Sequence, residues 1–142
     1  MFTLGIIREF RTANFRVIVD AIEEDSPDLS WDDDGETREG IESGKYLLFC
    51  ARARVVHDDL GEIASDYLGN CVYESLDAFQ DHRACAAYER KLNAERKARG
   101  EGEVIVGSYF SDMVRQVCRD ARAKLHTVRE GLNGLTIRTV QS

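Results

Sequence analysis

The fold is decided by the stretch GSYFSDMVRQVCRDARAKL, residues 107–125, which carries the clearest helical pattern in the chain. Ser108 or Ser111 is suited to cap its first turn, and Gly131 or Gly134 to end it. Its apolar residues recur at steps of three and four and therefore share one stripe of a helix: Phe110, Val114, Val117, Ala121, Leu125, Val128 and Leu132. We expect the rest of the chain to cover this stripe.

The length and composition indicate one domain, residues 1–142, which is long enough to bury a core without disulfide or metal staples. The chain holds no apolar run near the ~18 residues that a membrane span requires, and its first residues lack a secretory pattern. We therefore expect a cytoplasmic protein without a membrane partner. The four cysteines form no CxxC pair, so each is expected to act as a small buried hydrophobe.

Charge is divided unevenly along the chain. Residues 1–82 hold 19 Asp and Glu against 7 Lys and Arg, whereas residues 83–142 hold 7 against 12. Residues 20–42 alone carry 11 carboxylates and one arginine. Exposed ion pairs contribute only about 0–1 kcal/mol each, too little to draw this segment across the apolar packing onto the basic helices. We therefore predict that the acidic and basic surfaces lie apart.

The first half of the chain has the alternating pattern of β-strands. Residues 2–10 and 14–22 predict a hairpin that turns near residues 11–13, and residues 62–73 predict a return strand broken at Gly69-Asn70. The strongest strand pattern is residues 45–57. It places five apolar residues on one face and two arginines on the other: Leu47, Phe49, Ala51, Ala53 and Val55 against Arg52 and Arg54.

Helical patterns fill most of the remainder. Residues 31–43 predict a short helix capped by Ser30 and ended by Gly44, with Leu29, Trp31 and Ile41 as its anchors to the core. Residues 75–98 predict a long helix with an interruption near residues 81–83. Residues 104–106 and the residues after Gly134 are candidates for short strands. The expected fold is α+β, an antiparallel sheet of three to five strands with two long helices packed on one face.

The motifs of common enzymes and metal sites are missing from the sequence. The acidic run DDDGE, residues 32–36, fails as a calcium loop, because the position that requires a bidentate glutamate is Ile41. The three histidines share no metal spacing, and a nucleophile pair of Cys85 with His82 is less favoured than a structural cysteine. We therefore predict no catalytic residues, no metal site and no cofactor, and rank an enzyme last.

Two motifs and the helix of residues 107–125 resemble a known family. The motifs are LGNCVYES at residues 68–75 and LSWDDDG at residues 29–35. Together they resemble small uncharacterised proteins found in phage and plasmid genomes, a family without assigned catalytic residues. The resemblance implies a bacterial host cell and, by analogy, an accessory factor that counters host defences such as CRISPR or restriction systems.

The leading functional hypothesis is therefore a binding protein that inhibits a host protein or ribonucleoprotein defence complex. Its acidic surface would occupy a groove meant for nucleic acid, because a row of carboxylates competes for the lysines and arginines that bind phosphates. The predicted partner-binding residues are Asp28, Asp32, Asp33, Asp34, Glu36, Glu39, Glu42, Asp58 and Asp59.

The alternative hypothesis is a nucleotide or nucleic-acid binder that uses arginines for phosphate recognition. Its predicted ligand-binding residues are Arg52, Arg54, Arg115, Arg119 and Arg122. Direct nucleic-acid binding is less favoured, because acidic residues are interleaved with the basic ones along both long helices. A homodimer is left open.

Overall fold

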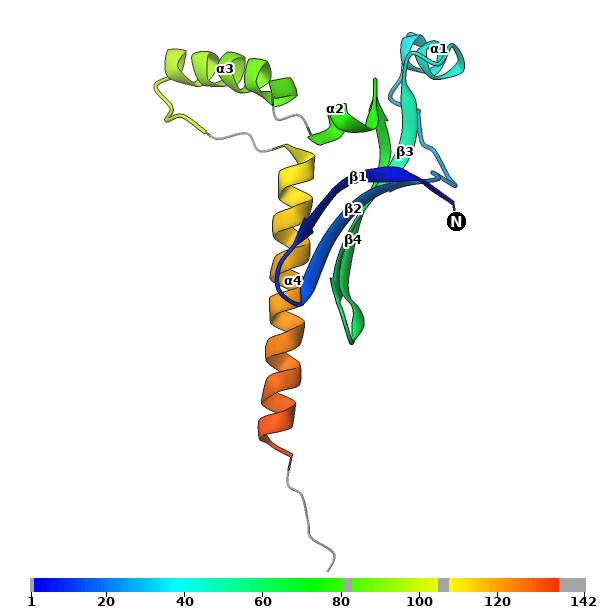
Figure 1. Ribbon diagram of the computed structural model, residues 1–142. Coiled ribbons are helices and arrows are strands. Elements are labelled where there is room, and N and C mark those ends of the chain that lie inside the picture. Colours follow the sequence, from blue (N-terminus) through cyan, green and yellow to red (C-terminus); the bar gives the residue numbers. More distant parts are fainter. Residues whose placement is uncertain (1, 81–82, 105–107, 136–142) are drawn as a thin grey trace, which may run out of the picture.

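The computed structural model describes residues 2–80, 83–104 and 108–135, except for the side chains of residues 83–88. Within these residues four strands form one antiparallel sheet in the order β1-β2-β3-β4, accompanied by four helices (Figure 1). The elements are β1 (Thr3–Arg11), β2 (Phe15–Ile22), α1 (Glu36–Glu42), β3 (Leu47–His57), β4 (Gly61–Tyr73), α2 (Leu76–Gln80), α3 (Arg83–Ala98) and α4 (Tyr109–Asn133). The predicted α+β class is confirmed.

The strands follow the sequence pattern closely. In β3, Phe49, Ala51 and Ala53 are completely buried, while the arginines between and beyond them lie on the other face. The predicted break at Gly69-Asn70 is a β-bulge: Ala51 pairs with Leu68 and Phe49 with Cys71, so two residues of β4 oppose one residue of β3. Of the sheet's two faces, one is therefore apolar and one carries charge.

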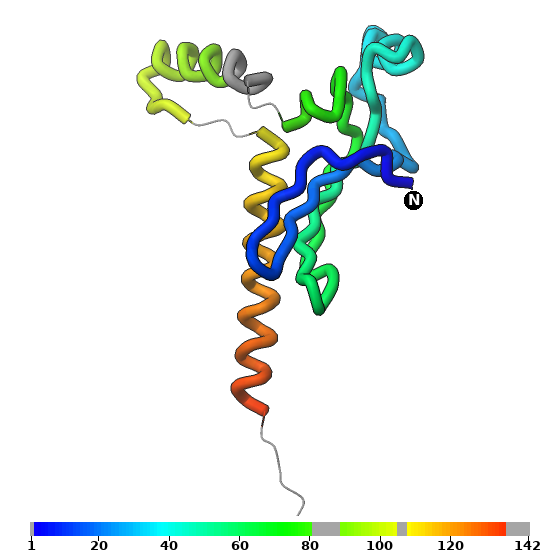
Figure 2. The backbone as a smooth tube through the Cα atoms, viewed as in Figure 1, coloured from blue at the N-terminus to red at the C-terminus, as the bar shows by residue number. Residues whose placement is uncertain are grey.

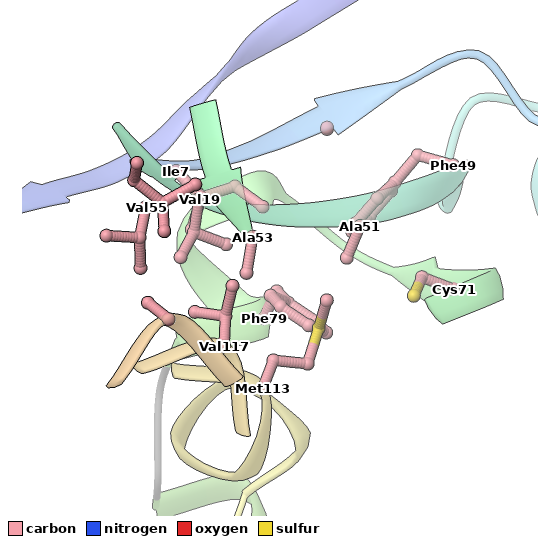
Figure 3. Packing of buried hydrophobic residues seen from close by; sticks show 13 residues of the cluster. Ile7, Val19, Phe49, Ala51, Ala53, Val55, Cys71, Phe79, Met113 and Val117 are labelled. Carbon is pink, nitrogen blue, oxygen red and sulfur yellow. The ribbon is translucent and has the colours of Figure 1, made fainter. Parts of the chain in front are cut away.

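Helix α4 packs on the apolar face of the sheet, as the stripe predicts. Figure 3 shows Met113 and Val117 of α4, with Phe79 of α2, gathered below the sheet residues Val19 and Ala53. Ser108 caps α4, because its Oγ accepts the backbone N–H of Ser111 at 3.1 Å. The helix ends at Gly134. The phenyl ring of Phe79 also contacts the rings of three other aromatic residues, which are Phe49, Tyr73 and Phe110.

The apolar stripe of α4 is longer than the surface that covers it. A helix of 25 residues is about 37 Å long, and Figure 1 shows its C-terminal part extending past the sheet. Residues 126–133, which we call the outer part of α4, are all exposed; Val128 is 51% and Leu132 is 62% exposed. The expectation that the whole stripe is covered holds for Phe110 to Leu125 only.

The second long helix, α3, stands away from the sheet in Figures 1 and 2. Of the two long helices expected on one face, only α4 lies there, with the short α2 beside it. Instead, α3 holds the segment that follows it: the side-chain amide of Asn93 exchanges two hydrogen bonds with the backbone of Val104, at 2.9 and 3.0 Å. Residues 81–82, 105–107 and 136–142 lie outside the described residues, and with them the helix interruption and most of the two candidate late strands.

Helix α1 is shorter than the predicted helix of residues 31–43. It begins at Glu36, because Asp32 accepts the backbone N–H groups of Thr37 and Arg38 and Gly35 adopts a left-handed φ of 74°. Ser30 therefore does not cap it. Trp31 is 55% exposed and is not the core anchor that was expected.

None of the helices in the described part of the chain is both long and apolar enough to span a membrane.

Candidate functional site

The acidic loop, which we define as residues 23–35 between β2 and α1, is fastened to the bulge of β4. Glu24 Oε2 accepts the backbone N–H of Asn70 at 2.7 Å, and Asn70 Oδ1 accepts the backbone N–H of Asp28 at 2.8 Å. Asn70 has a left-handed φ of 54°, which few residues besides glycine adopt readily. A Cβ atom on Gly69 would lie 2.9 Å from Glu24 Oε2, so glycine permits this close approach. The bulge therefore anchors the loop to the sheet.

Three carboxylates of the loop stabilise its own backbone. Asp28 accepts the backbone N–H of Ser30, Asp34 accepts that of Glu36, and Asp32 accepts two backbone N–H groups at the start of α1. Hydrogen bonds from the side chain and backbone of Ser30 lower the pKa of Asp28. Desolvation raises the pKa of Asp32, but its backbone hydrogen bonds outweigh this effect and the pKa is lowered. These carboxylates therefore shape the loop through hydrogen bonds to its backbone, although Asp28 and Asp34 are exposed.

Helix α1 is seated on the end of β3 by close packing. Gly40 is buried, and a Cβ atom at this position would collide with the ring of Tyr46. The backbone N–H of Tyr46 donates to the carbonyl of Gly40 at 3.0 Å. The helix is therefore held at both ends, by Asp32 at its start and by Tyr46 near its end.

Among the predicted partner-binding residues of the acidic loop and α1, four exposed carboxylates have no hydrogen bond or ion pair within the described residues. They are Asp33, Glu36, Glu39 and Glu42, which we call the acidic patch. They follow one another at steps of three residues, so successive members are neighbours on the surface of α1 and its approach. The acidic patch is a group of free negative charges on a supported piece of backbone.

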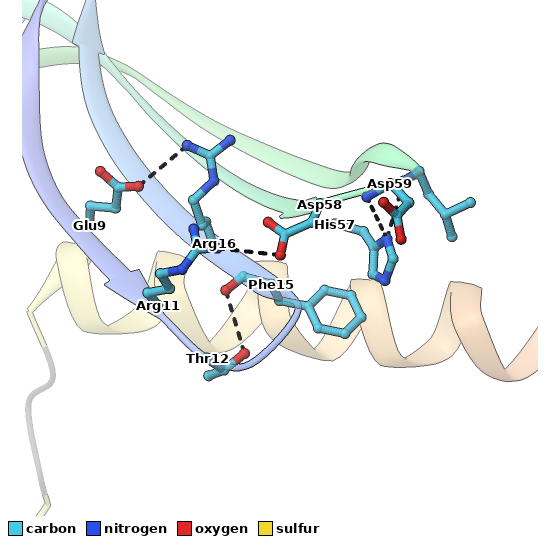
Figure 4. A network of polar contacts seen from close by, with 9 residues as sticks. Glu9, Arg11, Thr12, Phe15, Arg16, His57, Asp58 and Asp59 are labelled. Atoms are coloured by element: carbon cyan, nitrogen blue, oxygen red, sulfur yellow. Dashed lines mark hydrogen bonds and ion pairs between the residues drawn. The ribbon is translucent and has the colours of Figure 1, made fainter.

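Asp58 and Asp59 lie far from the acidic patch. They occupy the turn after β3, whereas α1 precedes β3, and a strand of 11 residues separates the two by roughly 30 Å. Figure 4 shows Asp58 facing Arg11, with which it forms an ion pair at 3.4 Å. The nine predicted partner-binding residues thus divide into the acidic patch, three residues that shape the loop, and two at the opposite end of the sheet.

The face of the sheet opposite α4, which we call the uncovered face, carries a cluster of charged side chains around one buried carboxylate. Asp20, which is 2% exposed, accepts hydrogen bonds from Arg52 at 2.9 and 2.6 Å and from Arg54 at 3.4 Å. The cross-strand register places Asp20 directly opposite Arg52. The hydrogen bonds that Arg52 donates to Asp20 raise the pKa of Arg52. The sequence pattern does not identify Asp20 as the partner of these arginines, because 32 residues separate it from Arg52.

The five predicted ligand-binding arginines do not form one site. Arg52 and Arg54 lie on the uncovered face, whereas Arg115, Arg119 and Arg122 lie on α4, which packs on the other face. The three α4 arginines are exposed and line two shallow hollows of about 230 and 270 Å³.

Among the described residues, no ion pair joins a carboxylate of residues 32–42 to an arginine of α3 or α4. The ion pairs that would have contradicted the predicted separation of acidic and basic surfaces are therefore not found in that part of the chain.

Cys50 and Cys71 show no sign of an activated thiol. Cys71 is buried, and burial raises its pKa to about 11. Burial also raises the pKa of Cys50, which lies on the other face of the sheet. His82 and the side chain of Cys85 lie outside the described residues.

A pocket beside the acidic loop was not anticipated from the sequence. Its aromatic walls come from three places in the chain, Trp31, Tyr73 and Tyr109. The one available signal was the Gly69-Asn70 break, which marks the bulge that lines its floor.

No protein-family model matches the chain, and neither the curated proteins nor the solved structures contain a significant match.

Proposed function

We propose that the protein is a non-enzymatic inhibitor that binds a host defence complex, of the CRISPR or restriction type, through its acidic patch. The patch would cover a groove that the complex uses for nucleic acid. The observation that carries this proposal is the acidic patch itself, four carboxylates that have no partner among the described residues and stand on a loop and helix fastened to the sheet.

The negative charge of the acidic patch indicates a target with a basic surface. A surface that binds nucleic acid presents lysines and arginines spaced for phosphates, and carboxylates attract the same groups. The fixed loop also favours binding, because a surface that is already ordered loses less conformational freedom on association. The separation of the patch from the basic helices leaves its field available to a partner.

The test is binding to purified CRISPR effector and restriction complexes at rising salt. We expect one of them to bind the protein, to release its bound DNA or RNA in exchange, and to lose affinity steeply as the salt concentration rises. The triple variant Asp33→Lys, Glu36→Lys, Glu39→Lys should not displace nucleic acid. Asp32 is left intact, because its replacement would disturb the start of α1. Displacement that is equally strong with the triple variant would rule the proposal out.

A second candidate function is nucleotide or nucleic-acid binding by α4. It is favoured by one observation, the exposed row of Arg115, Arg119 and Arg122, whose guanidinium groups have no ion pair within the described residues. Arg52 is less suited to bind a phosphate than the sequence suggested, because its guanidinium group already donates two hydrogen bonds to Asp20. Fluorescence polarisation with labelled single- and double-stranded oligonucleotides tests it, and reversal of the three arginines to glutamate should then abolish binding.

A further inference from the structure

A hollow beside the acidic loop is lined by aromatic rings. It has a volume of about 460 Å³ and lies between the loop, the bulge of β4 and the start of α4. Trp31 and Tyr109 are 55% and 61% exposed, which is unusual for such large side chains in a chain with one tryptophan and five tyrosines. A volume of this size lies within the range of small-ligand pockets.

Two of the three rings, those of Trp31 and Tyr73, are held in place by neighbouring groups. The indole N–H of Trp31 donates to the carbonyl of Asp28 at 3.0 Å, and Asp28 is itself bound by Asn70. Tyr73 packs edge-on against Phe79, with ring centroids 5.2 Å apart. The same contacts that anchor the acidic loop therefore also set one wall of the pocket.

The surroundings of the pocket are negatively charged. Trp31 also borders a second hollow of about 330 Å³, whose other lining residues are Asp32, Asp33, Asp34, Glu36 and Thr37. Trp31 thus stands between an aromatic pocket and the acidic patch. Aromatic faces attract cations, and arginine stacks on them particularly well. A phosphate, in contrast, would meet carboxylates on this side.

We propose that the aromatic pocket accepts an arginine side chain of the partner protein. This inference rests on the proposed function, which supplies a partner with a basic surface, and it adds the anchor that charge alone does not provide. The guanidinium group stacks on Trp31, Tyr73 and Tyr109, while the acidic patch attracts further basic residues of the same partner. Anchors of this kind, a planar cation in an aromatic pocket with charged surroundings, commonly dominate interface energies.

The experiment uses the fluorescence of Trp31, the single tryptophan of the chain. The probe is a capped peptide of four Arg-Gly repeats, compared with otherwise identical peptides that carry lysine or citrulline. We expect the arginine peptide to change Trp31 emission saturably, the lysine peptide to bind more weakly, and the uncharged citrulline peptide to bind at least about tenfold more weakly.

Two matched variants locate the binding. Tyr109→Leu should weaken the arginine peptide about tenfold, whereas Tyr67→Leu should leave it unchanged. Tyr67 is 52% exposed like Tyr109, but it lies opposite Arg52 on the uncovered face of the sheet. Equal effects of the two variants, equal binding of the citrulline peptide, or no response of Trp31 would each overturn the inference. Preferential binding of a nucleotide or a proline-rich peptide would overturn it as well.

The triple lysine variant of the acidic patch separates this inference from the proposed function. Loss of peptide binding in the triple variant, with Tyr109→Leu behaving like Tyr67→Leu, would support the acidic patch and overturn the pocket. Loss in Tyr109→Leu alone would support the pocket and remove the acidic patch from the proposed function.

Discussion

The acidic loop and the outer part of α4 both leave the body of the sheet, but they are held differently. The loop is polar, yet it is tied to Asn70 by two hydrogen bonds and its helix is seated on Tyr46. The outer part of α4 carries the apolar residues Val128 and Leu132, yet all its side chains are exposed. Specific hydrogen bonds therefore fasten the polar loop to the sheet, whereas apolar composition alone does not bury the outer part of α4.

The largest expected effect separates the two parts of α4. Val117→Ala should lower the free energy of unfolding by about 2–3 kcal/mol, because the side chain is completely buried and its truncation leaves a cavity. Val128→Ala, the same change in the outer part, should cost less than about 0.5 kcal/mol. Urea unfolding followed by circular dichroism measures both. Similar losses in the two variants would mean that the outer part of α4 is covered in solution.

The next effect concerns the anchor of the loop. Asn70→Ala should lower the free energy of unfolding by about 1–2 kcal/mol, because it removes a hydrogen bond and places alanine in a left-handed conformation. Asn70→Gly is the matched control, since it removes the same amide but tolerates the left-handed backbone. We expect it to be the less destabilised of the two. A smaller effect of alanine than of glycine would contradict the assigned geometry.

Both Asn70 variants should also alter the fluorescence of Trp31, because the loop that carries the indole loses one of its ties. Unchanged emission in both variants would show that the loop does not depend on Asn70.

The sequence predicts those structural features that depend on a local residue pattern. Alternation places Phe49 and Ala51 on one face of β3, and the Gly69-Asn70 break marks the bulge. The helical period identifies the apolar stripe of α4, but it does not tell how far the sheet extends beneath it. For this reason Val128 was expected to be covered and is exposed.

Local patterns do not predict contacts between residues that lie far apart in the sequence. The pairing of Asp20 with Arg52 depends on the register between β2 and β3, and the aromatic pocket brings together Trp31, Tyr73 and Tyr109. The predicted helix of residues 31–43 was too long for a local reason. The carboxylate of Asp32 binds the N–H groups of Thr37 and Arg38, which fixes the start of α1 four residues after Asp32 itself.

The smallest expected effect is a pH dependence of the loop. The pKa values of Asp28 and Asp32 lie below the ordinary value of 3.8, so both carboxylates stabilise the folded loop above that pH. This contribution is lost as the pH falls through their lowered pKa values. We expect a change in Trp31 emission below about pH 4 that precedes global unfolding. Asp32→Asn should weaken this transition, and Asp33→Asn, whose carboxylate makes no such hydrogen bonds, should retain it. A transition that is the same in both variants would disagree with the role of Asp32.

In the proposed function the acidic patch, and not the arginine row of α4, binds the partner. The most direct measurement compares two charge reversals in one binding assay with the defence complex identified by the salt-dependent screen. One variant changes Asp33, Glu36 and Glu39 to lysine, and the other changes Arg115, Arg119 and Arg122 to glutamate. We predict that the first variant loses binding and that the second binds as the unmodified protein does. Loss of binding in the second variant, with normal binding in the first, would contradict it.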